Sequence, residues 1–217
     1  MRLIIACAGS QTKWAGHLGV PSHLAPLTAH GGVPLLYRTI GQARELTADV
    51  HVTAPAGDRR YRVPGTTLHE QDGSAPSEYA ATRALWATDV RTVLLLGDVY
   101  FSDAAMARIA TSPGRRYRVF GRFGPSHQTG TPYGEIFAAS WWPEQHAQMD
   151  AHLDLVHRTR AAGTITRPPG WMLLRAWQGT PLAKHRVDSR YFEEIDDLTD
   201  DIDFPADYER HPATRRH

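Results

Sequence analysis

The chain has 217 residues, of which 41% are hydrophobic and 22% charged, and its formal net charge is +1. This composition is typical of a globular protein, and the length suits one large core, so we predict a single domain over residues 1–210 and a frayed tail over 211–217. Basic residues cluster at 59–62 and 115–118, but no dominant basic stretch emerges. We therefore interpret them as solvated faces, which makes nucleic acid a poor candidate partner.

Cysteine use and hydropathy indicate a cellular compartment. The single cysteine, Cys7, excludes a disulfide framework within one chain and favours a reducing environment. The apolar run at residues 3–8 is too short for a signal peptide, and nothing approaches the roughly 20 apolar residues of a spanning helix. We therefore expect a cytoplasmic protein with no membrane partner.

Strand and helix patterns alternate along the first half of the chain. Apolar runs of strand length predict four strands, and apolar spacing of three and four residues predicts two helices between them. The strands fall at 3–7, 50–54, 66–69 and 93–96, and the helices at 34–46 and 77–87. Such alternation requires crossover connections, so we predict an α/β fold with a mostly parallel sheet in a three-layer αβα arrangement.

The second half is less regular. Residues 117–122 and 134–140 are predicted strands, and 144–161 is a predicted helix. A Pro-Pro loop at 167–170 precedes an apolar segment at 172–177. Further on, an acidic segment at 193–205 leads into a short helix from Ala206.

The run Val93–Val99 ends a buried strand on a carboxylate, Asp98. An aspartate in this position often caps the next helix, but Ser102 or Asp103 stands directly before the helical pattern at 104–109 and can do so. Asp98 is thus left in the turn at the carboxyl end of a strand, where α/β sheets bind their ligands.

Two further segments carry possible chemistry. The loop from Gly9 to Lys13 follows a buried strand, so its N–H groups and the Lys13 ammonium are candidates for surrounding a phosphate. The acidic segment at 193–205 interleaves carboxylates with Ile195, Leu198 and Ile202. Part of it must face a core, so one of its aspartates can join Asp98 in the carboxylate pair that Mg²⁺ uses.

Other catalytic classes find little support. The 12 histidines lack the spacing of a zinc site. There is no Gly-x-Ser-x-Gly motif, and Cys7 lies inside the first apolar run, where a small core residue is expected.

Several motifs occur in the order typical of one superfamily. Ala6–Trp14 is similar to L-A-A-G-x-G-T-R-M, Pro21–Leu24 to P-K-x-L, and Gly32–Arg38 to G-x-P-L-L-x-R. Gly97-Asp98 resembles a central G-D, and Asp201–Tyr208 resembles a late D-x-D-T-P-E-D-L. The chain thus resembles the nucleotidyltransferase superfamily of GT-A fold, which includes sugar-1-phosphate nucleotidylyltransferases, phosphocholine cytidylyltransferases and molybdenum cofactor guanylyltransferase.

The resemblance implies a metal-dependent enzyme that transfers a nucleotidyl group from a nucleoside triphosphate to a small phosphorylated acceptor. Asp98 and Asp203 would hold Mg²⁺ or Mn²⁺, and both would be catalytic together with Lys13. The implied nucleotide-binding residues are Ala8, Gly9, Ser10, Gln11, Thr12, Lys13, Gly73, Ser74, Glu78 and Gly97. Such chemistry depends on positioning and charge neutralisation rather than on a covalent nucleophile.

The chain also departs from the family pattern. Gln11 replaces the second loop glycine, Lys13 replaces an arginine, and Ser22 replaces the lysine of P-K-x-L, so a cation is lost. The candidates to replace it are His23, Arg38 and Arg122.

This deficit keeps alternatives open. One is a GT-A glycosyltransferase that uses a nucleotide-sugar, with Glu135 or one of Asp196 and Asp197 as the base. The simpler interpretation of Glu135 is a strand residue that faces solvent. The other alternative is a nucleotide-binding protein without turnover.

Overall fold

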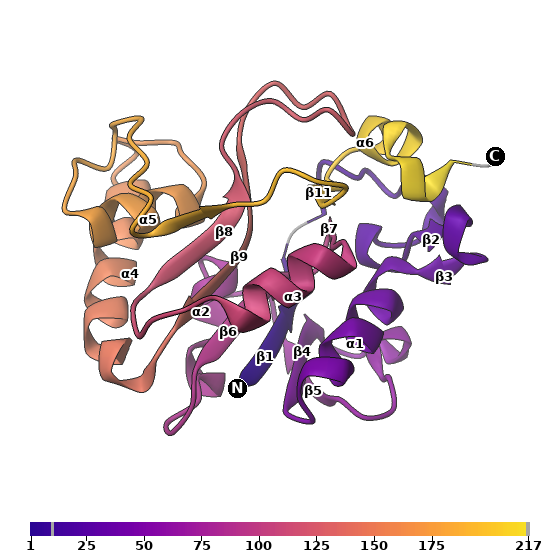
Figure 1. The fold of residues 1–217 in the computed structure, drawn as a ribbon, viewed down its shortest axis with the longest axis horizontal. Helices are drawn as coiled ribbons and strands as arrows, with labels where there is room; N and C mark the ends of the chain where they lie inside the picture. Colours follow the sequence, from indigo (N-terminus) through magenta and orange to yellow (C-terminus); the bar gives the residue numbers. More distant parts are fainter. Residues whose placement is uncertain (10, 216–217) are drawn as a thin grey trace.

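The computed structural model describes residues 1–9 and 11–215. Its centre is a seven-stranded sheet with the strand order β10-β8-β9-β6-β1-β4-β5 (Figure 1). The strands are β1 (Arg2–Ala6), β4 (Val50–Pro55), β5 (Thr67–Gln71), β6 (Thr92–Leu96), β8 (Arg118–Arg122), β9 (Glu135–Trp141) and β10 (Phe192–Glu194).

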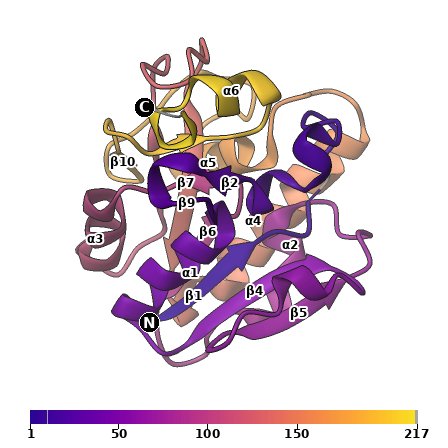
Figure 2. The ribbon, with the colours of Figure 1, turned by 90° about the vertical axis from the view of Figure 1, so that its right-hand side faces the viewer.

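Six of these strands run in one direction. The neighbouring pairs β4–β5, β1–β4, β1–β6 and β8–β10 are parallel, and only β9 runs against its neighbours β6 and β8. Figure 2 shows β1, β4 and β5 side by side. The carboxyl ends of β1 and β6 therefore meet at one edge of the sheet, where α/β folds bind ligands.

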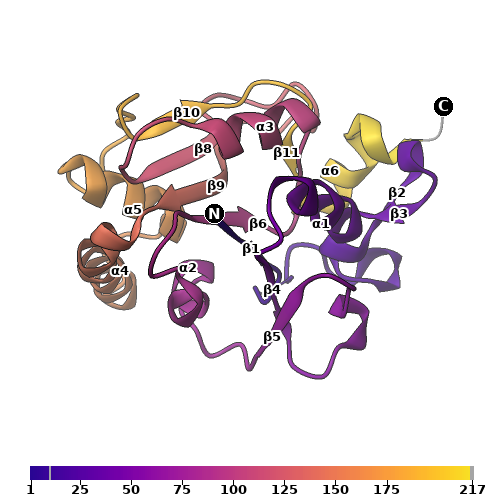
Figure 3. The same ribbon diagram turned by 60° about the horizontal axis from the view of Figure 1, so that its bottom comes forward.

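Helices cover both faces of the sheet (Figure 3). One face packs on α1 (Leu35–Leu46) and α3 (Asp103–Thr111), and the other on α2 (Glu78–Ala81), α4 (His146–Ala161) and α5 (Pro169–Gln178). Alternation along β1 explains this division, since Leu3 and Ile5 enter one core and Ile4 the other. The predicted three-layer α/β arrangement is confirmed.

Some expected elements differ from those observed. The predicted helix at 77–87 breaks into the one-turn α2 and a 3-10 turn, Arg83–Leu85, although Ser77 caps it by accepting a hydrogen bond from the N–H of Ala80. The predicted loop at 167–170 is wrong at its end, because Pro169 begins α5. Proline is favoured in the first helical turn, whose N–H groups have no partner within the helix.

Two short ribbons complete the molecule, β2 (Pro26–Leu27) with β3 (Val33–Pro34) and β7 (Val99–Tyr100) with β11 (Asp200–Asp201). The last helix, α6 (Pro205–Arg210), lies beside the long β8–β9 loop in Figure 1, and the Arg210 Nη1 donates to the carbonyl of Thr129 at 3.1 Å. No helix among the described residues is both long and apolar enough to cross a lipid bilayer.

The expected frayed tail does not begin at His211. The His211 side chain is fully buried, lies 4.8 Å from the Tyr100 ring between centroids, and shares a hydrogen bond of 2.9 Å with the carbonyl of Leu198. Ala213 and Thr214 are also buried. Residues 211–214 thus pack against the β7–β11 ribbon, because a short apolar and aromatic cluster covers it.

Candidate active site

Asp98 stands in the turn after β6, as the apolar run predicted. Gly97 makes this turn possible, because a Cβ there would overlap the Cys7 Sγ and lie 2.6 Å from the Ala6 carbonyl oxygen. Only glycine permits that approach of two backbones. Gly97 therefore shapes the turn. It was predicted to bind nucleotide, but it is not among the residues that line the adjoining cavity.

The β7–β11 ribbon brings the acidic segment to Asp98. Asp201 pairs with Val99 in antiparallel register, and the Ile202 N–H donates to the Asp98 carbonyl at 2.9 Å. Side chains alternate along this extended segment, so Asp201 and Asp203 share one side while the intervening Ile202 is fully buried in a core cluster. One carboxylate oxygen from each of Asp98, Asp201 and Asp203 lies within 4.8 Å of the others.

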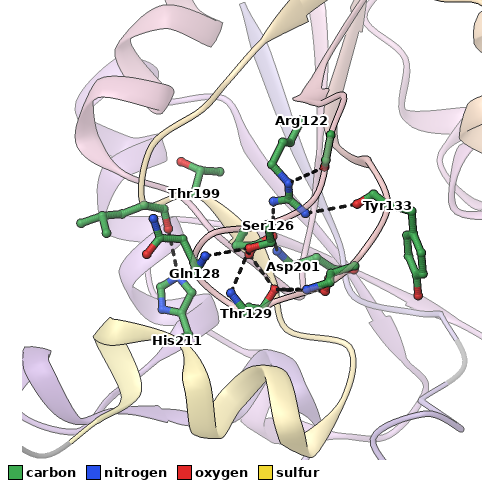
Figure 4. A network of polar contacts seen from close by, with 12 residues as sticks. Arg122, Ser126, Gln128, Thr129, Tyr133, Thr199, Asp201 and His211 are labelled. Atoms are coloured by element: carbon green, nitrogen blue, oxygen red, sulfur yellow. Dashed lines mark hydrogen bonds and ion pairs between the residues drawn. The ribbon is translucent and has the colours of Figure 1, made fainter.

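A buried ion pair anchors the base of this ribbon. The Arg122 Nη1 contacts the Asp200 Oδ1 at 2.5 Å, and both side chains are almost completely buried. Ser126 and Thr129 of the β8–β9 loop also donate to the Asp200 Oδ2. Figure 4 shows this network directly beside Asp201, which it holds in register.

Crowding of carboxylates changes their acidity. Burial and the negative charge of Asp203 raise the pKa of Asp98 to about 7 and that of Glu135 to about 8. Burial, Asp98 and Asp203 likewise raise the pKa of Asp201 well above its usual range. In the folded chain these carboxylates therefore resist being ionised at the same time, because their negative charges repel one another. A bound cation would offset that repulsion.

The donor set fits a hard divalent cation. The Asp201 Oδ1 is buried and has no hydrogen-bond partner among the described residues, so it is an unsatisfied acceptor inside the cluster. A cavity of about 270 Å³ adjoins it, and five carboxylates line that cavity against one ammonium, that of Lys13. These carboxylates belong to Glu78, Asp98, Glu135, Asp201 and Asp203. Oxygen-only donor sets of this kind suit Mg²⁺ and Mn²⁺.

The loop after β1 forms another wall of the same cavity. Gln11, Thr12 and Lys13 line it, and the Gln11 side chain is fixed because its Oε1 accepts from the Ser22 N–H at 2.6 Å. The Lys13 ammonium forms an ion pair with Asp203. Burial opposes the charged form of Lys13, but the carboxylates of Asp203, Asp201 and Glu135 together outweigh it and raise the pKa of Lys13. Ser10, predicted to bind nucleotide, lies outside the described residues.

A second cavity, of about 250 Å³, adjoins the loop on the side of α2. Ala8, Gly9, Gly73 and Glu78 line it together with Ser77, so four of the predicted nucleotide-binding residues meet there. Ser74 does not line it. The Ser74 side chain is exposed, and its N–H donates to the Asp72 Oδ1 at 2.9 Å.

None of the proposed substitutes for the missing lysine supplies a free cation. His23 lines the cavity, but burial lowers its pKa to about 4, so it is neutral at pH 7. Arg38 lies over the Tyr100 ring at 4.5 Å and pairs with Asp103, away from the cavity. Arg122 is committed to Asp200.

The structure adds Asp201 to the predicted site and brings in Glu135, which was predicted only as a base for the alternative glycosyl transfer. Asp201 was hidden within an acidic segment whose register only the ribbon fixes. Glu135 lines the cavity beside Lys13 and is partly buried, so the simpler expectation that it faces solvent is wrong. The alternative bases Asp196 and Asp197 are not among the residues lining this cavity.

The mostly parallel sheet, with an anionic cluster at the carboxyl ends of its central strands, is an α/β fold that solved nucleotidyltransferases share. A Bacillus anthracis protein, provisionally named a glucose-1-phosphate thymidylyltransferase and solved with sucrose, matches with a TM-score of 0.68 at 15% identity, over 100% of this chain and 96% of that one.

Two cytidylyltransferases are similar to this chain at lower scores. The CTP:phosphocholine cytidylyltransferase of Streptococcus pneumoniae has a TM-score of 0.55 at 15% identity and covers 95% of both chains. The 2-C-methyl-D-erythritol 4-phosphate cytidylyltransferase of Thermus thermophilus has a TM-score of 0.55 at 20% identity, over 95% of this chain and 94% of that one. No protein-family model and no curated protein sequence matches the chain.

Proposed function

We propose that this protein is a metal-dependent nucleotidyltransferase that transfers a nucleotidyl group from a nucleoside triphosphate to a small phosphorylated acceptor. The observation that carries the proposal is the cluster of Asp98, Asp201 and Asp203 at the carboxyl ends of the central strands, beside Lys13. The fold, shared with nucleotidyltransferases acting on different phosphorylated acceptors, supports the same reaction class.

Asp98, Asp201 and Asp203 are the residues that would hold the cation. Bound Mg²⁺ or Mn²⁺ supplies charge neutralisation at the phosphate oxygens. Asp203, which would help to hold the cation, is the carboxylate with which Lys13 pairs in this structure. A cation there would compete with Lys13 for Asp203 and would leave the Lys13 ammonium available to the phosphates.

The remaining residues position the reactants. Gly9 and Thr12 of the loop face the space beside Lys13, and the cavity lined by Gly73 and Glu78 is the place for the base and ribose. An oxygen of the acceptor phosphate forms a bond to the α-phosphorus, and the bridging bond to the β-phosphate breaks. Pyrophosphate leaves with that electron pair, and no covalent enzyme intermediate is required.

The scarcity of cations favours a second candidate, glycosyl transfer from a nucleotide-sugar. Among the described residues, Lys13 is the one lysine or arginine that lines the cavity beside the carboxylates, and a nucleotide-sugar brings one phosphate fewer to neutralise than a nucleoside triphosphate does. In this reaction Glu135 is placed to accept a proton from an acceptor hydroxyl.

Thermal stabilisation distinguishes the two reactions. The protein is heated with Mg²⁺ or Mn²⁺ and a panel of nucleoside triphosphates, and separately with a panel of nucleotide-sugars. We expect stabilisation by a triphosphate, and Asp98→Ala and Asp203→Ala to lose it together with pyrophosphate release while remaining folded. Asp196→Ala, an exposed carboxylate of the same segment, is the matched control. Stabilisation by nucleotide-sugars alone would favour glycosyl transfer, and stabilisation without pyrophosphate release or any other turnover would leave a nucleotide-binding protein.

A further inference from the structure

A third cavity, of about 450 Å³, opens beside the carboxylate site and has a different character. Four residues line both cavities, so the two adjoin: Lys13, Glu135, Pro168 and Trp171. Phe123, Tyr133, Arg167, Arg175 and His185 line the larger one alone. Its volume falls in the range of small-molecule sites.

Two guanidinium groups in this cavity lack a counterion. Arg175 is 2% exposed, and neither it nor Arg167 forms an ion pair with a carboxylate anywhere in residues 1–9 and 11–215. Burial and the nearby charge of Arg167 lower the pKa of Arg175 to about 10. A buried arginine next to a second cation is costly unless an anion joins them.

The orientation of Arg175 is fixed by the protein. Its Nε donates to the Lys184 carbonyl at 2.7 Å and its Nη1 to the Trp171 carbonyl at 2.8 Å, while its Nη2 has no hydrogen-bond partner among the described residues. Its guanidinium lies 5.0 Å from the centre of the Trp171 ring. Among the described residues, Arg167 forms side-chain hydrogen bonds to the His185 ring alone. Arg175 thus presents an unused donor of fixed direction, and Arg167 lines the same cavity.

Aromatic rings supply the remaining walls. The Trp171 ring stacks on Phe192 with centroids 5.9 Å apart, which fixes its plane. Phe123 and Tyr133, which also line this cavity, are 56% and 52% exposed, the two largest values among the exposed large hydrophobic residues of the described part of the chain. The lining of this cavity is mostly apolar, so its ring faces can stack on a flat apolar body while offering few hydrogen-bond partners for hydroxyl groups.

We propose that this cavity binds the acceptor, and that the acceptor joins its reactive phosphate to a second anionic group through a flat apolar body. The second anion binds Arg167 and Arg175, the body lies against Trp171, and the reactive phosphate lies at the wall shared with the carboxylate site. The assignment rests on the proposed nucleotidyl transfer and narrows its substrate class away from free sugar phosphates.

Three probes test each feature in turn. 4-Carboxyphenyl phosphate has both anions and a flat body, phenyl phosphate lacks the second anion, and glucose 1-phosphate lacks the flat body. Titration calorimetry with saturating Mg²⁺ and the stabilising nucleotide should rank their affinities in that order, with about tenfold lost when the carboxylate is removed.

Arg167→Ala should lower the affinity for 4-carboxyphenyl phosphate about tenfold and change the affinity for phenyl phosphate by no more than about twofold. Arg175→Lys, which keeps the charge of the buried side chain, should give a smaller loss of the same kind. Arg158→Ala, an exposed arginine of α4, should change neither affinity. Equal binding of glucose 1-phosphate, or an equal loss in Arg158→Ala, would overturn the assignment.

A failure of the proposed nucleotidyl transfer can be distinguished from a failure of the acceptor assignment. Arg167→Ala should keep the stabilisation by Mg²⁺ and nucleotide, which depends on Asp98 and Asp203. Suppose that Mg²⁺ and nucleotide do not bind, but the protein still prefers 4-carboxyphenyl phosphate to phenyl phosphate and needs Arg167 for this preference. The cavity is then not the acceptor site of a nucleotidyltransferase. If nucleotide binding holds and the preference is absent, the acceptor class alone is wrong.

Discussion

Replacing Asp98 with asparagine should stabilise the metal-free protein while abolishing its activity. The folded structure raises the pKa of Asp98 from 3.8 to about 7, because burial and Asp203 oppose its charge. At about 1.4 kcal/mol per unit, holding this carboxylate ionised at pH 8 costs about 4 kcal/mol relative to the unfolded chain. The amide side chain of the Asp98→Asn variant carries no charge and avoids that cost.

The pH dependence has a definite sign. Between pH 3.8 and about 7 the folded state binds more protons at Asp98 than the unfolded state does, so the stability of the wild type falls as the pH rises through this window. Glu135, whose pKa is raised to about 8, extends the fall upward. The advantage of the Asp98→Asn variant should therefore shrink from about 4 kcal/mol at pH 8 to about 2 kcal/mol at pH 5.

Urea unfolding in EDTA at the two pH values measures this difference. Added Mg²⁺ should then stabilise the wild type, most strongly at pH 8 where protons no longer compete, and should have no such effect on the variant. Asp196→Asn, in an exposed position, should show neither behaviour. A variant no more stable than the wild type at pH 8 without metal would refute the electrostatic reasoning.

Three further substitutions probe the framework of the site. Asp200→Asn leaves the Arg122 guanidinium buried without its partner, which should lower the free energy of unfolding by about 3 to 5 kcal/mol in urea. Gly97→Ala places a Cβ 2.6 Å from the Ala6 carbonyl oxygen and should destabilise by about 1 to 3 kcal/mol, measured the same way. Lys13→Met should weaken Mg²⁺-nucleotide binding about tenfold in calorimetry, yet leave binding of Mg²⁺ alone equal or tighter, since Asp203 loses an internal competitor.

Matched substitutions elsewhere in the chain serve as controls for these variants. Gly124→Ala, where an added Cβ meets nothing within 4 Å, should change stability little, and a loss equal to that of Gly97→Ala would contradict the argument from close approach. An Asp200→Asn protein as stable as Asp196→Asn would show that the buried pair is dispensable. Weaker binding of Mg²⁺ alone after Lys13→Met would mean that Lys13 supports the cation site instead of competing with it.

Local patterns predicted much of the framework. The apolar run before Gly97 predicts a strand that ends on Asp98, and the alternation of strands and helices predicts a parallel sheet, because both depend on residues adjacent in the chain. The same local reasoning fails for α2, whose predicted helix breaks after Ala81, and for Pro169, which was expected in a loop and begins α5.

The sequence by itself determined that carboxylates would lie at the end of a central strand and beside a loop that carries Lys13. Only the tertiary structure decided which carboxylates meet, since a shift of one residue in the β7–β11 ribbon would turn Asp200 into the cluster and Asp201 away from it. Contacts between segments far apart in the chain fix that register, through the buried Arg122–Asp200 pair. Such pairings depend on distant partners in space, and no pattern of neighbouring residues encodes them.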